Sequence, residues 1–263
     1  MYGAKTVEYA LDSDQGWDID TDDIRRKMND TVKFIVIVNP NNPTGNVAKP
    51  STIMEVLSIA KDWPNCTIIA DEIYDALDFS GDQRSVASLS DEVPVVTLNG
   101  VSKVHFAPGW RIGYMAFFDP KRTLQAPRDG AERILRSRLC ASTPAQYGYL
   151  AGLNHDRLWL KERLRTIERR VDLCMNRIEG IEGLSCNKPG GAFYLFPKID
   201  NPSKYGSDKK FVLDLLHEEH VLVVHGSGFS PRYGSGHFRL VALAPEDLLN
   251  EAFDRIDRFV RSR

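Results

Sequence analysis

The sequence has 263 residues, a length that suits one large domain or two small ones. Hydrophobic residues make up 42% and charged residues 27% of it, as in globular proteins with an apolar core. The formal net charge of -2 argues against a protein that binds nucleic acid or acidic membranes, because such proteins carry a basic excess. No apolar run reaches the roughly 18 residues of a transmembrane helix, and the N-terminus lacks a secretory pattern.

Four short, continuously apolar runs predict buried strands, because a strand that is covered on both faces shows no polar alternation. They span Phe34 to Val38, Thr67 to Ala70, Val95 to Leu98 and Tyr114 to Phe118. Helical patterns lie between them, and Ser51 is the expected cap of the helix that carries Ile53, Val56 and Leu57. This alternation predicts an α/β layer with a mostly parallel sheet.

The second half of the sequence has a different pattern. A long charged helix is expected from about Arg157 to Ile178, with Leu160, Leu164, Ile167, Val171 and Met175 on one stripe. The expected elements that follow are strands at Leu184 to Asn187, Ala192 to Lys198 and Val221 to Val224, and helices at Lys209 to Glu218 and Pro245 to Ser262. We therefore predict a large domain over residues 1–160 and a smaller α+β domain over residues 161–263, with a long helix near the boundary.

The four cysteines are widely spaced and form neither a CxxC motif nor a Cys/His cluster: Cys66, Cys140, Cys174 and Cys186. We expect no metal site from this pattern. Reduced thiols in a cytoplasmic protein are the expected state of these residues.

Three polar segments follow predicted strands, and in an open α/β sheet ligands gather at the carboxyl ends of strands. The first, NPNNPTG at residues 39–45, is a stiff turn that presents Asn42 as a neutral donor. The second begins with Asp71, a carboxylate that is costly at the end of a buried strand unless a cation or donor meets it, and includes Tyr74. Taken alone, this second segment is better explained as an ordinary strand end.

The third segment holds Ser102 and Lys103 and continues through Trp110 to Arg111. A lysine whose pKa is lowered by burial or by a nearby cation can attack a carbonyl carbon. A guanidinium such as that of Arg111 suits a phosphate. A lone lysine is more often a solvated surface residue, so the case for Lys103 depends on the other two segments.

Together the three segments resemble the fold-type I pyridoxal-phosphate aminotransferases, class I and II, in both order and spacing. Two later stretches, PGGAFY from Pro189 and GHFRL from Gly236, are similar to motifs of that family's small domain. The stretches around Arg138 and Val221 look like the branch that transaminates alanine with 2-oxoglutarate. The resemblance implies an L-amino acid and a 2-oxo acid as substrates, with alanine or glutamate as the expected donor, and a homodimer.

The resemblance also implies the role of each site residue. Lys103 would bond covalently to the aldehyde of pyridoxal 5′-phosphate and then serve as the acid/base at the substrate Cα. Asp71 would pair with the pyridinium nitrogen, and Asn42 and Tyr74 would donate to the 3′ oxygen. Arg111, with Ser102 as a further contact, would hold the phosphate. Arg239 would bind the substrate α-carboxylate, with Asn42 beside it.

The sequence departs from the family in one respect, because family members carry roughly another third of chain before the segment that begins near Thr6. That part supplies a helix N-terminus that helps to hold the phosphate. Two alternatives to a full aminotransferase therefore stay open: a shortened homologue that is inactive or depends on a partner, and a carbon–sulfur lyase on the same scaffold.

Overall fold

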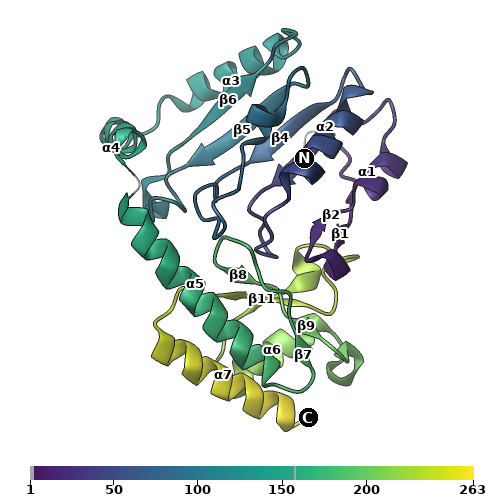
Figure 1. The fold of residues 1–263 in the computed structure, drawn as a ribbon, viewed down its shortest axis with the longest axis vertical. Helices are drawn as coiled ribbons and strands as arrows, with labels where there is room; N and C mark the ends of the chain where they lie inside the picture. Colours follow the sequence, from purple (N-terminus) through teal and green to yellow (C-terminus); the bar gives the residue numbers. More distant parts are fainter. Residues whose placement is uncertain (1–2, 157) are drawn as a thin grey trace. The chain divides into compact units, whose positions relative to one another are not determined.

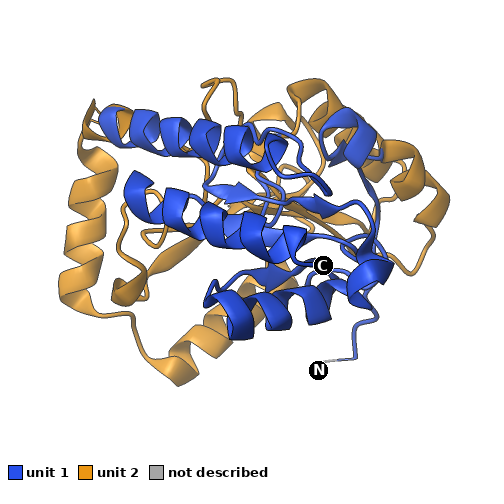
Figure 2. Cartoon of the chain, turned by 90° about the horizontal axis from the view of Figure 1, so that it is seen from below, with its two compact units in different colours: residues 1–20, 41–47, 162–263 blue, residues 21–40, 48–161 orange. Residues whose placement is uncertain are grey.

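The computed structural model describes residues 3–156 and 158–263. The chain divides into two compact units, which Figure 2 shows in different colours. Unit 1 comprises residues 1–20, 41–47 and 162–263, and unit 2 comprises residues 21–40 and 48–161.

Unit 2 is built on a four-stranded sheet, in the order β3-β4-β5-β6 (Figure 1). Its strands are β3 (Phe34–Val38), β4 (Thr67–Asp71), β5 (Val95–Gly100) and β6 (Gly113–Phe118). The first three run parallel, and β6 pairs antiparallel with β5. The prediction of a mostly parallel sheet is confirmed.

The helices of unit 2 differ in how many of their side chains are buried. They are α1 (Thr21–Lys27), α2 (Pro50–Lys61), α3 (Gln125–Arg138) and α4 (Thr143–Asn154). Helix α2 buries Ile53, Val56 and Leu57 as predicted, but its first residue is Pro50 and its N-cap is Lys49. The expected cap at Ser51 is therefore wrong, because a proline suits the first helical position, where its missing N–H costs nothing.

The sheet of unit 2 is not covered along its whole width within the described residues. Ile35 and Ile37 of β3 are buried, but the alternate residue Phe34 is 52% exposed. On β6, Met115 is 48% exposed. The prediction that all four strands are covered on both faces is thus wrong for β3 and β6, since a short apolar run does not distinguish a covered face from an open one.

Unit 1 contains three small sheets and most of the C-terminal helices. The strands are β1 (Leu11–Asp12), β2 (Asp18–Ile19), β7 (Leu184–Ser185), β8 (Tyr194–Leu195), β9 (Lys198–Ile199), β10 (Val224–His225) and β11 (Phe238–Val241). The sheets have the orders β1-β2, β10-β11-β8 and β7-β9. The single strand expected from Ala192 to Lys198 is divided into β8 and β9, which lie on either side of Pro197 and belong to different sheets.

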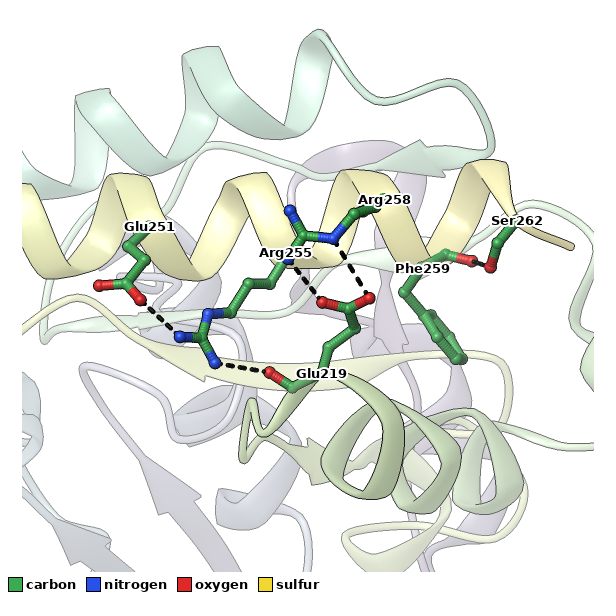
Figure 3. A network of polar contacts seen from close by, with 6 residues as sticks. All are labelled: Glu219, Glu251, Arg255, Arg258, Phe259 and Ser262. Carbon is green, nitrogen blue, oxygen red and sulfur yellow. Dashed lines mark hydrogen bonds and ion pairs between the residues drawn. The ribbon is translucent and has the colours of Figure 1, made fainter.

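The helices α6 (Asp208–Glu219) and α7 (Glu246–Arg261) pack around an aromatic core. The ring of Phe211 lies 5.3 Å from those of Phe238 and Phe259. Glu219 at the end of α6 meets two arginines of α7: its backbone oxygen accepts from Arg255 and its carboxylate from Arg258 (Figure 3). These contacts fix the end of α6 against α7.

The long helix α5 (Leu158–Glu179) agrees with the prediction, whose start at Arg157 lies outside the described residues. The division into two units falls within α5. Residues 1–20 and 41–47, however, group with the C-terminal unit, although we expected them in the large domain. The reason is local: Asn46 donates to the backbone oxygen of Trp17, and Gly190 and Gly191 donate to that of Gly45. Among the described residues, no helix has the length and apolar content needed to span a bilayer.

Candidate active site

The carboxyl ends of the parallel strands of unit 2 carry the predicted residues Asp71 and Lys103. Asp71 is the last residue of β4 and pairs in register with Leu98 of β5. Strand β5 ends at Gly100, so Ser102 and Lys103 lie in the turn directly beyond it. Both groups are thus presented at the same edge of the sheet, where ligands of α/β sheets bind.

The carboxyl group of Asp71 is partly buried and has little compensation for its charge. Burial raises its pKa above the ordinary value, and the hydrogen bond from the backbone N–H of Ile73, at 3.2 Å, only partly offsets this. No ion pair joins Asp71 to a cation among the described residues. A cationic ligand group at this position would relieve the cost of the buried carboxylate.

Glu72, the next residue, has a structural role. It is buried, and its carboxylate accepts hydrogen bonds from the backbone N–H of Val86 at 2.8 Å and from the Ser85 hydroxyl at 3.0 Å. These bonds tie the end of β4 to the loop that leads to β5. Glu72 therefore holds the segment in place, and its neighbour Asp71 is the carboxyl group that is open to a ligand.

Lys103 and Tyr74 come together in the structure. Tyr74 is buried, and the Lys103 Nζ lies 5.8 Å from the centroid of its ring. Tyr74 follows Asp71 by three residues, so one amine, one phenol and one carboxyl group belong to neighbouring strand ends. This set can supply a nucleophile, a hydrogen-bond donor and a counter-charge to a single ligand.

Two glycines bring β5 and β6 unusually close at the position of the site. A Cβ on Gly113 would lie 2.6 Å from the backbone oxygen of Asn99, and one on Gly100 would lie 2.7 Å from that of Ile112. Arg111 precedes β6, has a left-handed backbone with φ of 53°, and donates to the backbone oxygen of Pro108 at 2.8 Å. Its guanidinium is exposed and has further N–H groups for an anion.

Unit 1 contains the remaining two predicted residues, Asn42 and Arg239, in direct contact. The Arg239 Nη1 donates to the Asn42 Oδ1 at 2.8 Å. The Arg239 Nε is buried and has no hydrogen-bond partner within the described chain. The guanidinium lies 4.8 Å from the ring centroid of Tyr194 and 4.9 Å from that of Phe229. Such an arginine is a strong site for a carboxylate.

The loop that carries Asn42 is shaped by other residues of the same NPNNPTG motif. Asn41 accepts hydrogen bonds from the backbone N–H and hydroxyl of Thr44. Gly45 has φ of +70°, and a Cβ there would lie 2.4 Å from the Pro189 side chain and 2.5 Å from the Tyr194 oxygen. Gly45 and the PGG stretch at residues 189–191 are therefore contact partners, and this close approach with a positive φ explains the glycine at position 45.

The predicted residues thus form two groups. Unit 2 holds Asp71, Tyr74, Ser102, Lys103 and Arg111, and unit 1 holds Asn42 and Arg239. The aromatic ring of Phe229 was missed, because a single phenylalanine in a glycine-rich loop gives no signal of its own. The described residues contain no group of three or more His, Cys, Asp or Glu side chains that could hold a metal ion.

Comparison with known proteins gives one consistent family. Residues 1–256 match the model of the family described as aminotransferase class I and II. The glutamate-pyruvate aminotransferase AlaA of Haemophilus influenzae is 39% identical over 265 residues, and the alanine aminotransferase of Mycobacterium bovis is 34% identical over 271 residues. The matches cover 99% and 100% of this chain, but only 65% and 62% of these relatives.

A solved structure gives the same result for the fold. The alanine aminotransferase from Pyrococcus furiosus superposes with a TM-score of 0.96 at 47% sequence identity. The match covers 100% of this chain and 66% of that one. The chain therefore spans about two thirds or less of the proteins it is similar to.

Proposed function

The chain belongs to the class I and II aminotransferases, and from that premise we propose that it transfers an amino group between an L-amino acid and a 2-oxo acid. We propose pyridoxal 5′-phosphate as its cofactor and alanine or glutamate as the amino donor. The names of the relatives, glutamate-pyruvate and alanine aminotransferase, support this choice of donor. The observation that carries the proposal is the amine of Lys103 beside Tyr74, at the sheet edge where Asp71 forms an ion pair with none of the described residues.

The residues at this edge fit the cofactor by their chemistry. The partly buried Asp71 carboxyl has a raised pKa, and a pyridinium N–H would give it the missing cation and donor. Tyr74 would donate to the ring oxygen, and Arg111 and Ser102 would hold the phosphate. By the resemblance, Asn42 of unit 1 would be a further donor to the ring oxygen. When bound, pyridoxal phosphate supplies an aldehyde and an electron-withdrawing ring that acidifies the substrate Cα–H.

Three side chains of the chain would then have separate roles in the reaction. Lys103 would hold the cofactor through its aldehyde carbon, and its free amine would be the base that accepts the proton from the substrate Cα and donates a proton to the former aldehyde carbon. Asp71 would keep the proton on the ring nitrogen, and the Tyr74 hydroxyl would donate to the ring oxygen.

Arg239 would bind the substrate through its α-carboxylate. Asn42 already accepts one N–H of this guanidinium, so the side chain is oriented before a substrate arrives. Every α-amino acid and 2-oxo acid carries this carboxylate. The proposed role of Arg239 is therefore to bind substrates in general, without selecting among their side chains.

We also propose that the chain acts as a homodimer, as the resemblance implies. The cysteines are free thiols in the structure, which suits the reducing cytoplasm that we propose as its location.

Borohydride trapping tests the proposal directly. The purified chain is mixed with pyridoxal phosphate, its visible absorbance is recorded, and the sample is reduced with borohydride and mapped by mass spectrometry. We expect an absorbance band and a mass adduct on Lys103, both lost in Lys103→Ala. Lys121→Ala is the matched control, because Lys121 pairs with Glu92 and lies outside the site. An adduct spread over surface lysines, with none on Lys103, would contradict the proposal.

An activity panel tests the substrate assignment. Alanine, glutamate and aspartate are offered as donors against pyruvate and 2-oxoglutarate. We expect the alanine and 2-oxoglutarate pair, and its reverse, to be the fastest. Release of a sulfur-containing fragment from cysteine conjugates, without amino transfer, would instead identify a lyase.

A further inference from the structure

The guanidinium of Arg239 lies close to two aromatic rings. Its central carbon is 4.8 Å from the ring centroid of Tyr194 and 4.9 Å from that of Phe229. Both distances are within the range in which a cation is attracted to the face of an aromatic ring. The two rings come from segments that are 35 residues apart in the sequence, since Tyr194 belongs to β8 and Phe229 follows Gly226–Gly228.

The strand register explains the position of Tyr194. On β11, Arg239 and Val241 point to the same face, because side chains alternate along a strand. Val241 pairs with Tyr194 across the antiparallel ladder of β11 and β8. Tyr194 is therefore the diagonal neighbour of Arg239 on one face of the sheet, at a separation that long and aromatic side chains can bridge.

A closed loop holds Phe229 in its position. Gly226 donates to the backbone oxygen of His237, Phe229 donates to that of Gly226, and Gly234 donates to that of Ser230. A Cβ on either Gly226 or Gly234 would lie 2.1 Å from the backbone oxygen of the other. These contacts close the loop tightly.

The side chain of Phe229 is also supported from behind. Phe196 meets it edge-on, with ring centroids 6.1 Å apart, and Phe196 itself stacks on His237 at 5.0 Å. The ring of Phe229 is therefore fixed by the loop on one side and by an aromatic stack on the other.

The contacts of Arg239 leave its charge available. Its one recorded polar partner is the neutral amide oxygen of Asn42, and no carboxylate pairs with it among the described residues. We propose that Phe229, together with Tyr194, is a positioning residue that fixes the guanidinium plane of Arg239 for the carboxylate of the substrate. This inference rests on the proposed function of Arg239, and it adds Phe229, which no motif contains, to Tyr194, the last residue of the PGGAFY stretch.

The physical reason is the entropy of the arginine side chain. A free arginine loses much rotamer freedom when it binds a carboxylate with two parallel hydrogen bonds, and this loss weakens binding. A guanidinium that is already fixed by aromatic rings loses less. Replacing Phe229 by leucine keeps most of the apolar volume but removes the π face, so the substitution separates the stacking from simple packing.

The test uses the full chain without cofactor, with pyruvate as the probe. The Arg239 Nε–Hε resonance is assigned in a ¹⁵N-labelled sample by its loss in Arg239→Lys, and it is then followed during a pyruvate titration. For the parent chain we expect a resonance displaced by the ring currents of the two aromatic rings, and saturable binding. In Phe229→Leu we expect the resonance to move toward that of an exposed arginine, and the pyruvate affinity to fall about fivefold.

Two variants control the interpretation. Phe229→Tyr retains the π face and should restore both the resonance and the affinity. Tyr233→Leu removes the other aromatic ring of the same loop, which lies 5.0 Å from the guanidinium of Arg232, and should change neither. An unchanged Arg239 resonance and affinity in Phe229→Leu would overturn the inference.

Pyruvate binding by the parent chain tests the proposed function, and the comparison with Phe229→Leu tests the positioning role. If the parent chain does not bind pyruvate, the carboxylate role of Arg239 fails and the positioning role fails with it. If pyruvate binds equally to the parent chain and to Phe229→Leu, only the positioning role fails.

Discussion

The position of Asp71 in the fold disfavours the ionised form of its carboxyl group. Burial at the end of β4 raises the pKa of its carboxyl above the ordinary value of about 4, and one backbone N–H partly opposes the shift. The unfolded chain therefore ionises at lower pH than the folded chain. Below the ordinary pKa the carboxyl group is neutral in both states, and Asp71 then costs the folded chain no stability. The free energy of unfolding falls as the pH rises through the raised pKa, because the buried carboxyl group must then ionise.

We predict that Asp71→Asn stabilises the cofactor-free chain at pH 7, because the buried charge is removed and an acceptor for the Ile73 N–H remains. A gain of about 1 kcal/mol would raise the Tm by about 2–4 °C for a chain of this size. Thermal unfolding at pH 4 and pH 7 measures it, and the gain should be smaller at pH 4. A lower Tm at pH 7 would show that Asp71 has a stabilising partner.

The same substitution should harm transamination more than cofactor binding. Asparagine cannot balance a positive charge on the ring nitrogen, so the electron-withdrawing capacity of the ring falls. Single-turnover rates and the dissociation constant of pyridoxal phosphate separate the two effects. Equal losses in both would contradict the role that we propose for Asp71.

Arg239→Ala should raise the KM of every α-amino acid to a similar degree. Loss of a charge-assisted contact to the carboxylate corresponds to about 10- to 100-fold in binding. Steady-state kinetics with alanine, glutamate and aspartate measure the effect. A loss that is confined to one donor would assign Arg239 to the substrate side chain instead.

For single residues, the sequence predicted which side chains form the candidate site better than it predicted which other side chains contact them. Asp71 ends one recognisable strand, and Tyr74 and Lys103 lie shortly after recognisable strands, so their placement at strand ends could be predicted from local pattern. The contact of Phe229 with Arg239 could not, because it depends on a loop closure that involves Gly226 and Gly234 and has no periodic signature.

The hairpin of β5 and β6 is the element that positions both Lys103 and Arg111, since its two strands flank the segment that contains them. Gly100 and Gly113 pair directly across it. We predict that Gly113→Ala destabilises the chain by about 1–3 kcal/mol, because a Cβ would lie 2.6 Å from the backbone oxygen of Asn99, which cannot move freely. Chemical denaturation measures the loss.

Gly109→Ala is the matched control for this prediction. Gly109 lies in the same segment, in the short 3₁₀ helix Pro108–Trp110, and a Cβ there would meet nothing within 4 Å. We expect its stability to stay within about 0.5 kcal/mol of the parent chain. Equal stability of both variants would show that the strands can separate at Gly113 without cost.

Helices and strands could be predicted from the sequence where their apolar residues recur at regular spacing. Helix α7 buries Leu249, Phe253, Ile256, Phe259 and Val260, a regular stripe that fixes both its existence and its extent. Helix α3 buries no side chain at all, so no stripe marks it. The bounds predicted for β7, β8 and β10 of unit 1 were wrong for a related reason: two-residue strands are defined by their partners in the sheet and have no period of their own.

On the scale of the whole molecule, unit 2 exposes several large apolar side chains. Phe34 on β3, Met115 on β6, and Ile134 and Leu135 on α3 are each about half exposed or more. Leu139, directly after α3, is 81% exposed. Each such side chain costs free energy in water, so their burial against another copy would be favourable.

We therefore predict that the chain self-associates, and that Ile134→Asp weakens the association at least tenfold. Because α3 buries no side chain, this substitution leaves the core of unit 2 intact, and its effect reports on association alone. Sedimentation velocity over a range of concentrations measures the assembly. Leu213→Asp is the control, since Leu213 is an isolated exposed residue of α6 in unit 1 and should leave the association unchanged. A parent chain that stays monomeric at every concentration would contradict the homodimer, and it would leave the apolar surface of unit 2 in contact with water.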